Sequence, residues 1–388
     1  MKIKVLARDF TVEEVCNIDI KSRGDFSIYE LEKEGWDTFD LLDYLTRKYK
    51  LKNIGRAGIK DRYSHSVQYI SIKNGKPADI TEKNFKLTYL GKAEAPVTLN
   101  SQQGNFFKIV MRDLNRKETQ YVQTNLNSVQ KFGVLNYYDE QRMGSARAGQ
   151  GFIAPKLVRE HYNGALKLYL ASPSKFDDSR TRKLKKHLLA NWGDWQNCVA
   201  IPFALGAYQH PINYLAQHPK DFKGAVKTIR KDLLEMFINA YQAYVWNETV
   251  KELLNLKKIE YIKCRYGFGD LYFYEELSNN DYPYLADLSI SAPSYKAQFA
   301  DEQIQELMEQ VLARDNLKLK DLKIYLDIKG LFFKPYERRV LMLPQDLKVN
   351  EPAQDDLYPN KHKLTLSFTL PKGSYATILI KRITSFKV

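Results

Sequence analysis

One segment of the chain, GRAGIKDRYSHSVQ at residues 55–68, combines a tight turn with a carboxylate that could take part in catalysis. Asp61 stands between the basic side chains of Lys60 and Arg62, and small residues come just before them. Cations that face a carboxylate favour its ionised form, which leaves it available as a nucleophile or a base at neutral pH. The residues alone leave a second interpretation open, in which the segment is an exposed turn and Asp61 only pairs with its neighbours.

Other sequence patterns for catalysis are absent or incomplete. Ser64, His65 and Ser66 adjoin one another without a GxSxG elbow, and neighbours in sequence rarely point at each other. GFGD at 267–270 lacks the third glycine of a dinucleotide site, and the sequence has no GxxxxGK(S/T) phosphate loop. The three cysteines and six histidines show no metal-ligand spacing. The sequence therefore predicts no metal, no cofactor and no disulfide framework.

A second segment, GNFF at 104–107, could contact a nucleobase. The Asn105 side chain can hydrogen-bond a carboxylate or a base edge, and an aromatic ring that stacks on a base contributes about 1–3 kcal/mol. Successive side chains of a strand face opposite sides, so one of Phe106 and Phe107 must face inward. Without further context, both rings are more often core residues.

The formal net charge of +14 favours a polyanionic partner. A membrane is the weaker interpretation, because no apolar run approaches the roughly 20 residues that span a bilayer. The N-terminal segment lacks a signal-peptide core, so a cytoplasmic location is expected, and no protein partner is implied. Basic residues gather in SRTRKLKKH at 179–187, which is either a solvated helix face or an RNA-backbone contact made by Arg180, Arg182, Lys183, Lys185 and Lys186.

The helices and strands that must position these residues follow two different sequence patterns in different parts of the chain. Strand patterns predominate up to about residue 148, with one helix near 38–49 that Asp37 can cap. From about residue 150 the pattern changes to longer helices, and strand-like alternation returns near the end. The patterns predict strands at 3–16, 66–72, 86–91, 105–111, 363–369 and 375–383, and helices at 38–49, 117–131, 155–171, 180–191 and 224–256. A β-rich domain therefore opens the chain, is interrupted, and resumes at the end.

Seven segments resemble, in the same order, motifs of the TruD family of tRNA pseudouridine synthases. AGIKDRYSHSVQ at 57–68 is similar to the family's AGxKD segment, and GNFFKIVMRD at 104–113 is similar to GNxF followed by a strand. The other segments are DFTVEE at 9–14, NYYDEQRMG at 136–144, INAYQAYVWNE at 238–248, MLPQDL at 342–347 and LPKGSYAT at 370–377. The resemblance thus covers nearly the whole chain.

The resemblance implies an α+β fold. Its pseudouridine synthase core is a mixed, mainly antiparallel sheet with helices, interrupted by a large inserted α+β domain. On this interpretation residues 1–148 and 345–388 form the catalytic domain, and residues 149–344 form the inserted domain. The chain departs from the family pattern, which has Phe, Gly and Phe, at Tyr138, Asp139 and Met143.

The family's functional residues transfer to matching positions of this sequence. The resemblance implies that Asp61 is the catalytic aspartate, that Asn105 orients it, and that Phe107 packs against the target base. The family also has a lysine shortly before the DFTVEE segment, a position that Lys2 or Lys4 could fill. Further substrate contacts are expected at Lys4, Lys60, Arg62, Gln68 and Arg142.

The implied reaction is the isomerisation of uridine to pseudouridine in tRNA, at position 13 in the D-arm. The enzyme would cut the N1–C1′ bond, turn the base and rejoin it through C5, with Asp61 as a nucleophile or as the base that removes a ribose proton. One rival hypothesis is a non-catalytic tRNA-binding protein or RNA chaperone, which would not need Asp61. A second rival, an RNA methyltransferase, would need a glycine-rich cofactor loop that the sequence does not show.

Overall fold

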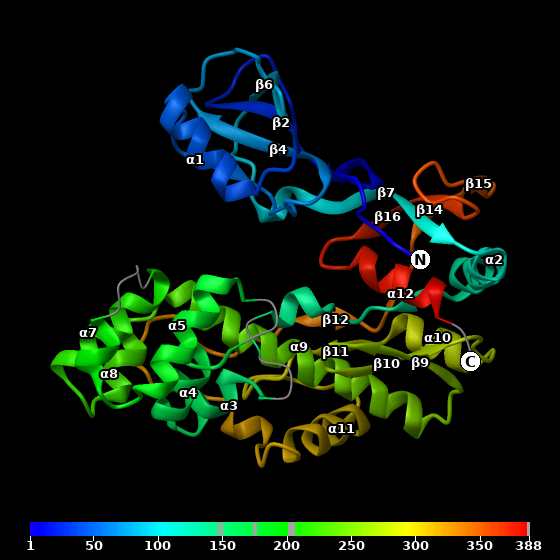
Figure 1. Cartoon of the computed structure of the whole chain (residues 1–388). Coiled ribbons are helices and arrows are strands. Elements are labelled where there is room, and N and C mark those ends of the chain that lie inside the picture. Colours follow the sequence, from blue (N-terminus) through cyan, green and yellow to red (C-terminus); the bar gives the residue numbers. More distant parts are fainter. Residues whose placement is uncertain (145, 147–149, 174–176, 201–205, 386–388) are drawn as a thin grey trace. The chain divides into compact units, whose positions relative to one another are not determined.

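The computed structural model describes residues 1–144, 146, 150–173, 177–200 and 206–385. The chain divides into two compact units, one formed by Met1–Asn136 with Leu341–Val388 and the other by Tyr137–Val340 (Figure 1). The second unit therefore begins earlier and ends earlier than the inserted domain that the sequence predicts at residues 149–344. Tyr138 already belongs to the second unit, where the Asn247 side chain accepts from its N–H and donates to its carbonyl, both at 2.9 Å. The division into a catalytic and an inserted domain stays a prediction about function.

The first unit is built around one sheet. Its strands are β1 (Phe10–Cys16), β2 (Phe26–Glu34), β3 (Ile54–Arg56), β4 (His65–Lys73), β5 (Ile80–Glu82), β6 (Phe85–Ala93), β7 (Gln102–Leu114), β14 (Gln345–Val349), β15 (Ala353–Gln354) and β16 (His362–Pro371). In the described part of the chain they pair in the order β14-β16-β7-β1-β4-β2-β6-β5, with β3 beside β4 and β15 beside β16. The β1–β4 pair is parallel and the other pairs are antiparallel. The expected α+β fold with a mixed, mainly antiparallel sheet is confirmed.

The helix predicted at 38–49 is α1, Thr38–Tyr49, which packs on the sheet beside β2 and β4 (Figure 1). The carboxylate of Asp37 caps its first turn by accepting the N–H groups of Phe39 and Asp40. Leu41 and Leu45 of the helix are fully buried against the sheet. The cap and the apolar face are local features, which is why the sequence pattern located this helix.

Helices α2 (Arg116–Phe132) and α12 (Ala376–Thr384) also belong to the first unit and lie side by side (Figure 1). The strand predicted at 375–383 is therefore wrong. The buried positions of α12, which include Leu379, Arg382 and Ile383, recur at helical spacing. Arg382 donates to Asn125 Oδ1 at 2.9 Å, and Asn125 Nδ2 donates to the Ile383 carbonyl at 3.0 Å. This packing on α2 decides the conformation of the segment.

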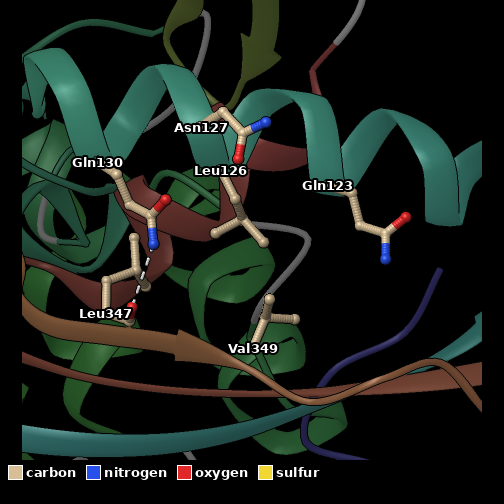
Figure 2. A pocket seen from close by; sticks show the side chains of 6 residues that line it. All are labelled: Gln123, Leu126, Asn127, Gln130, Leu347 and Val349. Atoms are coloured by element: carbon tan, nitrogen blue, oxygen red, sulfur yellow. Dashed lines mark hydrogen bonds between the residues drawn. The ribbon is translucent and has the colours of Figure 1, made fainter.

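A groove of about 240 Å³ separates α2 from β14, the edge strand of the sheet. Leu126 points from α2 toward Leu347 and Val349, and Gln130 Nε2 donates to the Leu347 carbonyl at 3.3 Å (Figure 2). The short strands β8 (Val134–Leu135) and β13 (Leu341–Met342) pair antiparallel, so the chain leaves and re-enters the unit at one place.

The second unit is mainly helical. Its helices are α3 (Ile153–Val158), α4 (Tyr162–Leu170), α5 (Ser179–Ala190), α6 (Trp195–Val199), α7 (Gln209–Gln217), α8 (Phe222–Lys227), α9 (Lys231–Leu256), α10 (Asp281–Asp287) and α11 (Glu302–Ala313). Its strands pair as β9 (Tyr261–Tyr266) with β10 (Gly269–Tyr274) and as β11 (Ser289–Ser291) with β12 (Glu337–Arg339). The 26-residue helix α9 is the core of the unit, since apolar side chains such as Trp246 are fully buried along it.

Candidate active site around Asp61

Asp61 lies in the loop that joins β3 to β4, and buried side chains hold the backbone of that loop. The ammonium of Lys33 on β2 donates, at 2.8, 3.2 and 3.1 Å, to the carbonyl oxygens of Trp36, Lys60 and Asp61. Thr38 Oγ1 accepts the N–H of Lys60 at 3.0 Å. Lys33 and Thr38 are both almost completely buried. The end of β2 and the start of α1 therefore fix the backbone that presents the carboxylate.

The carboxylate of Asp61 forms an ion pair with Lys4, with 2.8 Å between Nζ and Oδ2. The two side chains are 37% and 25% exposed, so a substrate can reach them. Lys4 has a φ of 57°, in the left-handed region that is unfavourable for a residue with a side chain, and its ammonium lies 4.2 Å from the centre of the Phe10 ring. Lys2 pairs with Asp113 instead. Of the two lysines that the sequence left open, Lys4 is the one at the carboxylate.

Lys60 adjoins Asp61 in sequence, but its ammonium is part of a buried cluster. It donates to Glu14 Oε1 at 2.7 Å and to Asn105 Oδ1 at 2.9 Å. Only 6% of the Lys60 side chain and none of the Glu14 side chain is exposed. Gly58 leaves room for this pair, since a Cβ atom there would lie 3.0 Å from Glu14 Oε1. Lys60 is predicted to bind substrate, and in the structure its buried ammonium, from the β3–β4 loop, donates to Asn105.

The Asn105 amide has a defined orientation because its oxygen faces donors. Both the ammonium of Lys60 and Gln102 Nε2, at 2.8 Å, donate to Oδ1, and an ammonium cannot accept. Asn105 Nδ2 is therefore directed elsewhere and can donate to a carboxylate or a base carbonyl. The preceding Gly104 is required by strand packing, since a Cβ atom there would lie 2.4 Å from the Leu370 carbonyl oxygen on β16.

Arg62 and Gln68, the other substrate contacts expected near Asp61, lie in different surroundings. Arg62 is exposed, and its Nε donates to the Gly35 carbonyl at 3.2 Å. Gln68 is fully buried, with Oε1 3.2 Å from Thr38 Oγ1, and its Nε2 has no hydrogen-bond partner among the described residues. Arg62 is therefore accessible beside Asp61, whereas Gln68 supports the loop from within.

The two aromatic residues of β7 face opposite sides, and Phe107 is the inward one. Its ring is 7% exposed, packs edge-on against Phe10 and stacks on Phe368 at 5.5 Å between ring centres. Phe106 is half-buried. The structure thus buries Phe107, the residue that the resemblance places against the target base, more deeply than Phe106, and the contact with the base stays a prediction. Phe107 supports Phe10, over whose ring the ammonium of Lys4 lies.

The chain matches the family model of tRNA pseudouridine synthase D (TruD) over residues 1–271 and 284–383. The chain belongs to the TruD family. A family member from Methanocaldococcus jannaschii is 33% identical, over 98% of this chain and 91% of its own length. The tRNA pseudouridine synthase D of Aquifex aeolicus is 29% identical, over 99% and 98%. A solved TruD structure from Methanosarcina mazei shares 26% identity with a TM-score of 0.75, covering 99% of this chain and 93% of its own. The resemblance read from seven segments is confirmed, and the chain is a pseudouridine synthase enzyme.

The sequence pattern did not identify two buried charged residues of this candidate site, Lys33 and Glu14, or the strand β2 that carries Lys33. Both positions interrupt an alternation of apolar residues: Glu14 follows Phe10 and Val12 on one face of β1, and Lys33 follows Leu31 on β2. A charge at a core-facing strand position needs a buried partner. That break in alternation was the signal available in the sequence.

The pKa of Lys33 is also perturbed. Burial, with a smaller contribution from the ammonium of Lys60, lowers this pKa to about 8 against the opposing effect of the Asp37 and Asp61 carboxylates. The ammonium that holds the loop is therefore close to losing its charge in mildly alkaline solution.

Predicted binding residues outside this site belong to the second unit. Arg142 lies in the short helix Glu140–Met143, and its Nε is buried without a hydrogen-bond partner in the described part of the chain. On α5, four of the five basic residues are exposed, namely Arg180, Arg182, Lys183 and Lys186. The expectation for Lys185 is wrong, because its fully buried ammonium donates to both carboxylate oxygens of Asp177 at 2.7 and 2.9 Å.

Two further properties concern the whole described chain. No group of His, Cys, Asp and Glu side chains among the described residues is arranged to hold a metal ion. Within the same residues, no helix combines the length and apolar character needed to cross a bilayer.

Proposed function

We propose that this enzyme converts uridine 13 in the D-arm of tRNA to pseudouridine, with Asp61 as its catalytic carboxylate. Support for the reaction comes from the family to which nearly the whole chain belongs. Support for the residue comes from the Lys4–Asp61 ion pair, which carries the proposal. It joins two partly exposed residues, 57 positions apart in sequence. Asp61 matches the aspartate of the family's AGxKD segment, and Lys4 is one of the two lysines that could fill the family's lysine position before DFTVEE.

The roles of the side chains follow from their contacts. The ammonium of Lys4 stabilises the Asp61 anion by Coulombic attraction, so Asp61 can act as a nucleophile on the ribose or the base, or as the base that removes a ribose proton. Because the Oδ1 of Asn105 accepts from Lys60 and Gln102, its Nδ2 is the group that would donate to this carboxylate or to a uracil carbonyl. Uracil leaves C1′ through N1 and returns through C5, and the proton lost from C5 is balanced by the one gained at N1. The isomerisation therefore needs no oxidant, reductant or co-reactant.

The target base must leave its stack before Asp61 can reach it. Extrusion costs a few kcal/mol, by an order-of-magnitude estimate. Contacts between exposed cations and the RNA backbone offset this cost, and the net charge of +14 supplies many such cations. Arg62 is the exposed cation adjacent to Asp61 in sequence.

The test compares wild-type enzyme with Asp61→Asn, which keeps the shape of the side chain and removes its charge. Purified protein is incubated with tRNA, and pseudouridine is located by carbodiimide labelling and primer extension. We expect one stop at position 13 with the wild type and none with Asp61→Asn, at unchanged melting temperature and equal or tighter tRNA binding. Asp43→Asn is the matched control, since this exposed carboxylate on α1 pairs only with the solvent-exposed Arg47 in the described contacts.

Each outcome addresses a different part of the proposal. A stop at another uridine, or a stop that persists in tRNA carrying cytidine at position 13, would overturn the assignment of uridine 13 as the target. Substantial turnover by folded Asp61→Asn would overturn the assignment of Asp61 as the catalytic carboxylate. Tight tRNA binding by the wild type without any isomerisation would favour the non-catalytic tRNA-binding protein or RNA chaperone.

A further inference from the structure

A cavity of about 480 Å³ lies in the second unit, along one side of α4 and next to α3 and α5. Its lining includes two lysines, Lys156 and Lys167, together with His161 and Asn163. No aspartate or glutamate is among the described residues that line it. The cavity is therefore rich in hydrogen-bond donors and cations and has no carboxylate to oppose an anionic ligand.

The two lysines of this cavity have no anionic partner among the residues that the structure describes. Neither Lys156 nor Lys167 forms an ion pair with any carboxylate in the described part of the chain. Lys167 is exposed and Lys156 is half-buried, so both can be reached from solvent. Elsewhere in the same unit lysines do have carboxylate partners, as in the pairs Lys185–Asp177, Lys223–Glu160 and Lys251–Glu248. Two unpaired ammonium groups at one cavity create a local positive potential.

The neighbouring polar groups are also oriented as donors. Asn163 Oδ1 accepts the indole N–H of Trp192 at 3.1 Å, so its Nδ2 is left to donate. The His161 ring lies over Gly164, where a Cβ atom would come within 2.6 Å of the ring. His161 is also the residue before α4, and its side chain does not cap the first turn among the described contacts. The N–H groups of that turn add to the positive potential.

The positive surface continues from the cavity onto α5. Leu189 lines the cavity, and the exposed Lys186 and Arg182 lie three and seven residues before it, on the same face of the helix. From Arg182 to Leu189 the helix rises about 10 Å. A row of cations of this length suits a repeating anion better than a single small one.

We infer that this cavity and the adjoining face of α5 bind consecutive phosphodiester groups of the tRNA backbone. The inference rests on the proposed function, because tRNA is the polyanion that the enzyme must hold. Phosphate oxygens would accept from Lys156, Lys167 and Asn163 in the cavity, while Lys186 and Arg182 contact the backbone beyond it. Such contacts fix the position of the RNA without reading its sequence.

The test compares the double variant Lys156→Gln/Lys167→Gln with Lys320→Gln/Lys329→Gln. The control removes the same charge from two exposed lysines of the same unit that do not line the cavity. The tRNA dissociation constant is measured against NaCl concentration. We expect the salt slope of the first variant to be shallower by about 1.5, and its affinity at 0.1 M salt to be roughly 10- to 40-fold weaker, from two lost phosphate contacts. The control should lie within about twofold of the wild type, and the isomerisation rate at saturating tRNA should be unchanged in both variants.

A second measurement does not depend on the variants. Bound tRNA should protect Lys156 and Lys167 from acetylation by a water-soluble ester, as read by mass spectrometry, and should leave Lys320 and Lys329 reactive. Equal salt slopes for the two double variants, or unprotected cavity lysines, would overturn the inference. A wild type that makes no pseudouridine but shows the expected slope difference would overturn the proposed function and leave this inference standing.

Discussion

Lys33→Met is the substitution that tests most directly how the fold holds the loop that carries Asp61. Lys33 is 1% exposed, and its ammonium binds three backbone carbonyls, two of them at Lys60 and Asp61. Methionine has a similar length and removes the charge and all three hydrogen bonds. The backbone that carries the Asp61 carboxylate then loses its buried anchor.

Two opposing contributions determine how far Lys33→Met lowers the free energy of unfolding. Each hydrogen bond to a charged donor contributes about 1.5–3 kcal/mol, and three carbonyls lose theirs together. Against this, keeping the ammonium buried costs about 3 kcal/mol, which is the free energy that separates a pKa of about 8 from the ordinary 10.5. We therefore expect the free energy of unfolding to fall by about 1.5–6 kcal/mol. We also expect kcat to fall by roughly 100-fold, because a displacement of about 1 Å at a reacting group has that effect.

The pH dependence separates this role from ordinary packing. Between pH 8 and 10.5 Lys33 is protonated in the unfolded chain and neutral in the folded one, so the unfolded state binds more protons. The stability contribution of Lys33 therefore rises with pH in this window, and its burial penalty is constant below it. Activity changes in the opposite direction, because a neutral amine holds three carbonyls less firmly. We expect wild-type kcat to fall above about pH 8 and Lys33→Met to lack that decline.

The assay is single-turnover isomerisation of tRNA from pH 6 to 9.5, with urea unfolding at both ends of the range. Lys108→Met is the matched control, an exposed lysine on β7 of the same sheet, and should change stability by less than about 0.5 kcal/mol. If Lys33→Met has the same kcat and the same free energy of unfolding as the wild type, Lys33 does not anchor the loop and the reasoning is refuted. An alkaline decline of activity that persists in Lys33→Met would show that another group causes it.

Three further predictions follow from the site. Lys4→Met should lower kcat by about 100-fold or more with little change in tRNA affinity, whereas Lys2→Met should retain activity; the reverse order in single-turnover assays would show that the wrong lysine was assigned. Phe107→Ala should lower the free energy of unfolding by about 3–5 kcal/mol and Phe106→Ala by less than about 1 kcal/mol, and urea titrations that give equal losses would contradict the burial of Phe107. Removal of divalent metal by a chelator, with enough monovalent salt to keep tRNA folded, should leave turnover intact, so restoration of lost activity by added zinc would argue against a metal-free reaction.

The features that the sequence determined by itself are local ones, encoded within a single motif or helix. Asp61 and its flanking residues form one short motif, and the order of such motifs along the chain was enough to indicate the family. Helix α1 agrees with the range 38–49 because its cap at Asp37 and its apolar face are both encoded within the helix and its flank. The end of α2 at Gly133 follows from the same kind of local signal.

Only the tertiary structure decided which residues meet across long separations. Lys4 and Lys2 both precede the same motif, and the choice between them depends on a contact with Asp61, 57 residues away. Phe106 and Phe107 alternate on one strand, and the register of β7 with β1 and β16 sets which of them is buried.

The same reason explains the elements that were wrongly predicted or missed. The segment of α12 was predicted as a strand, but it forms a helix that packs on α2. The charged strand β2 lies inside the sheet, where its Lys33 binds the carbonyls of Lys60 and Asp61 in the β3–β4 loop as well as that of the nearby Trp36. The charge of Lys185 predicted an exposed position on its helix, but the side chain is buried and pairs with Asp177. Whether such a residue is buried depends on a partner outside its own helix or strand, and the pattern within that element does not identify the partner.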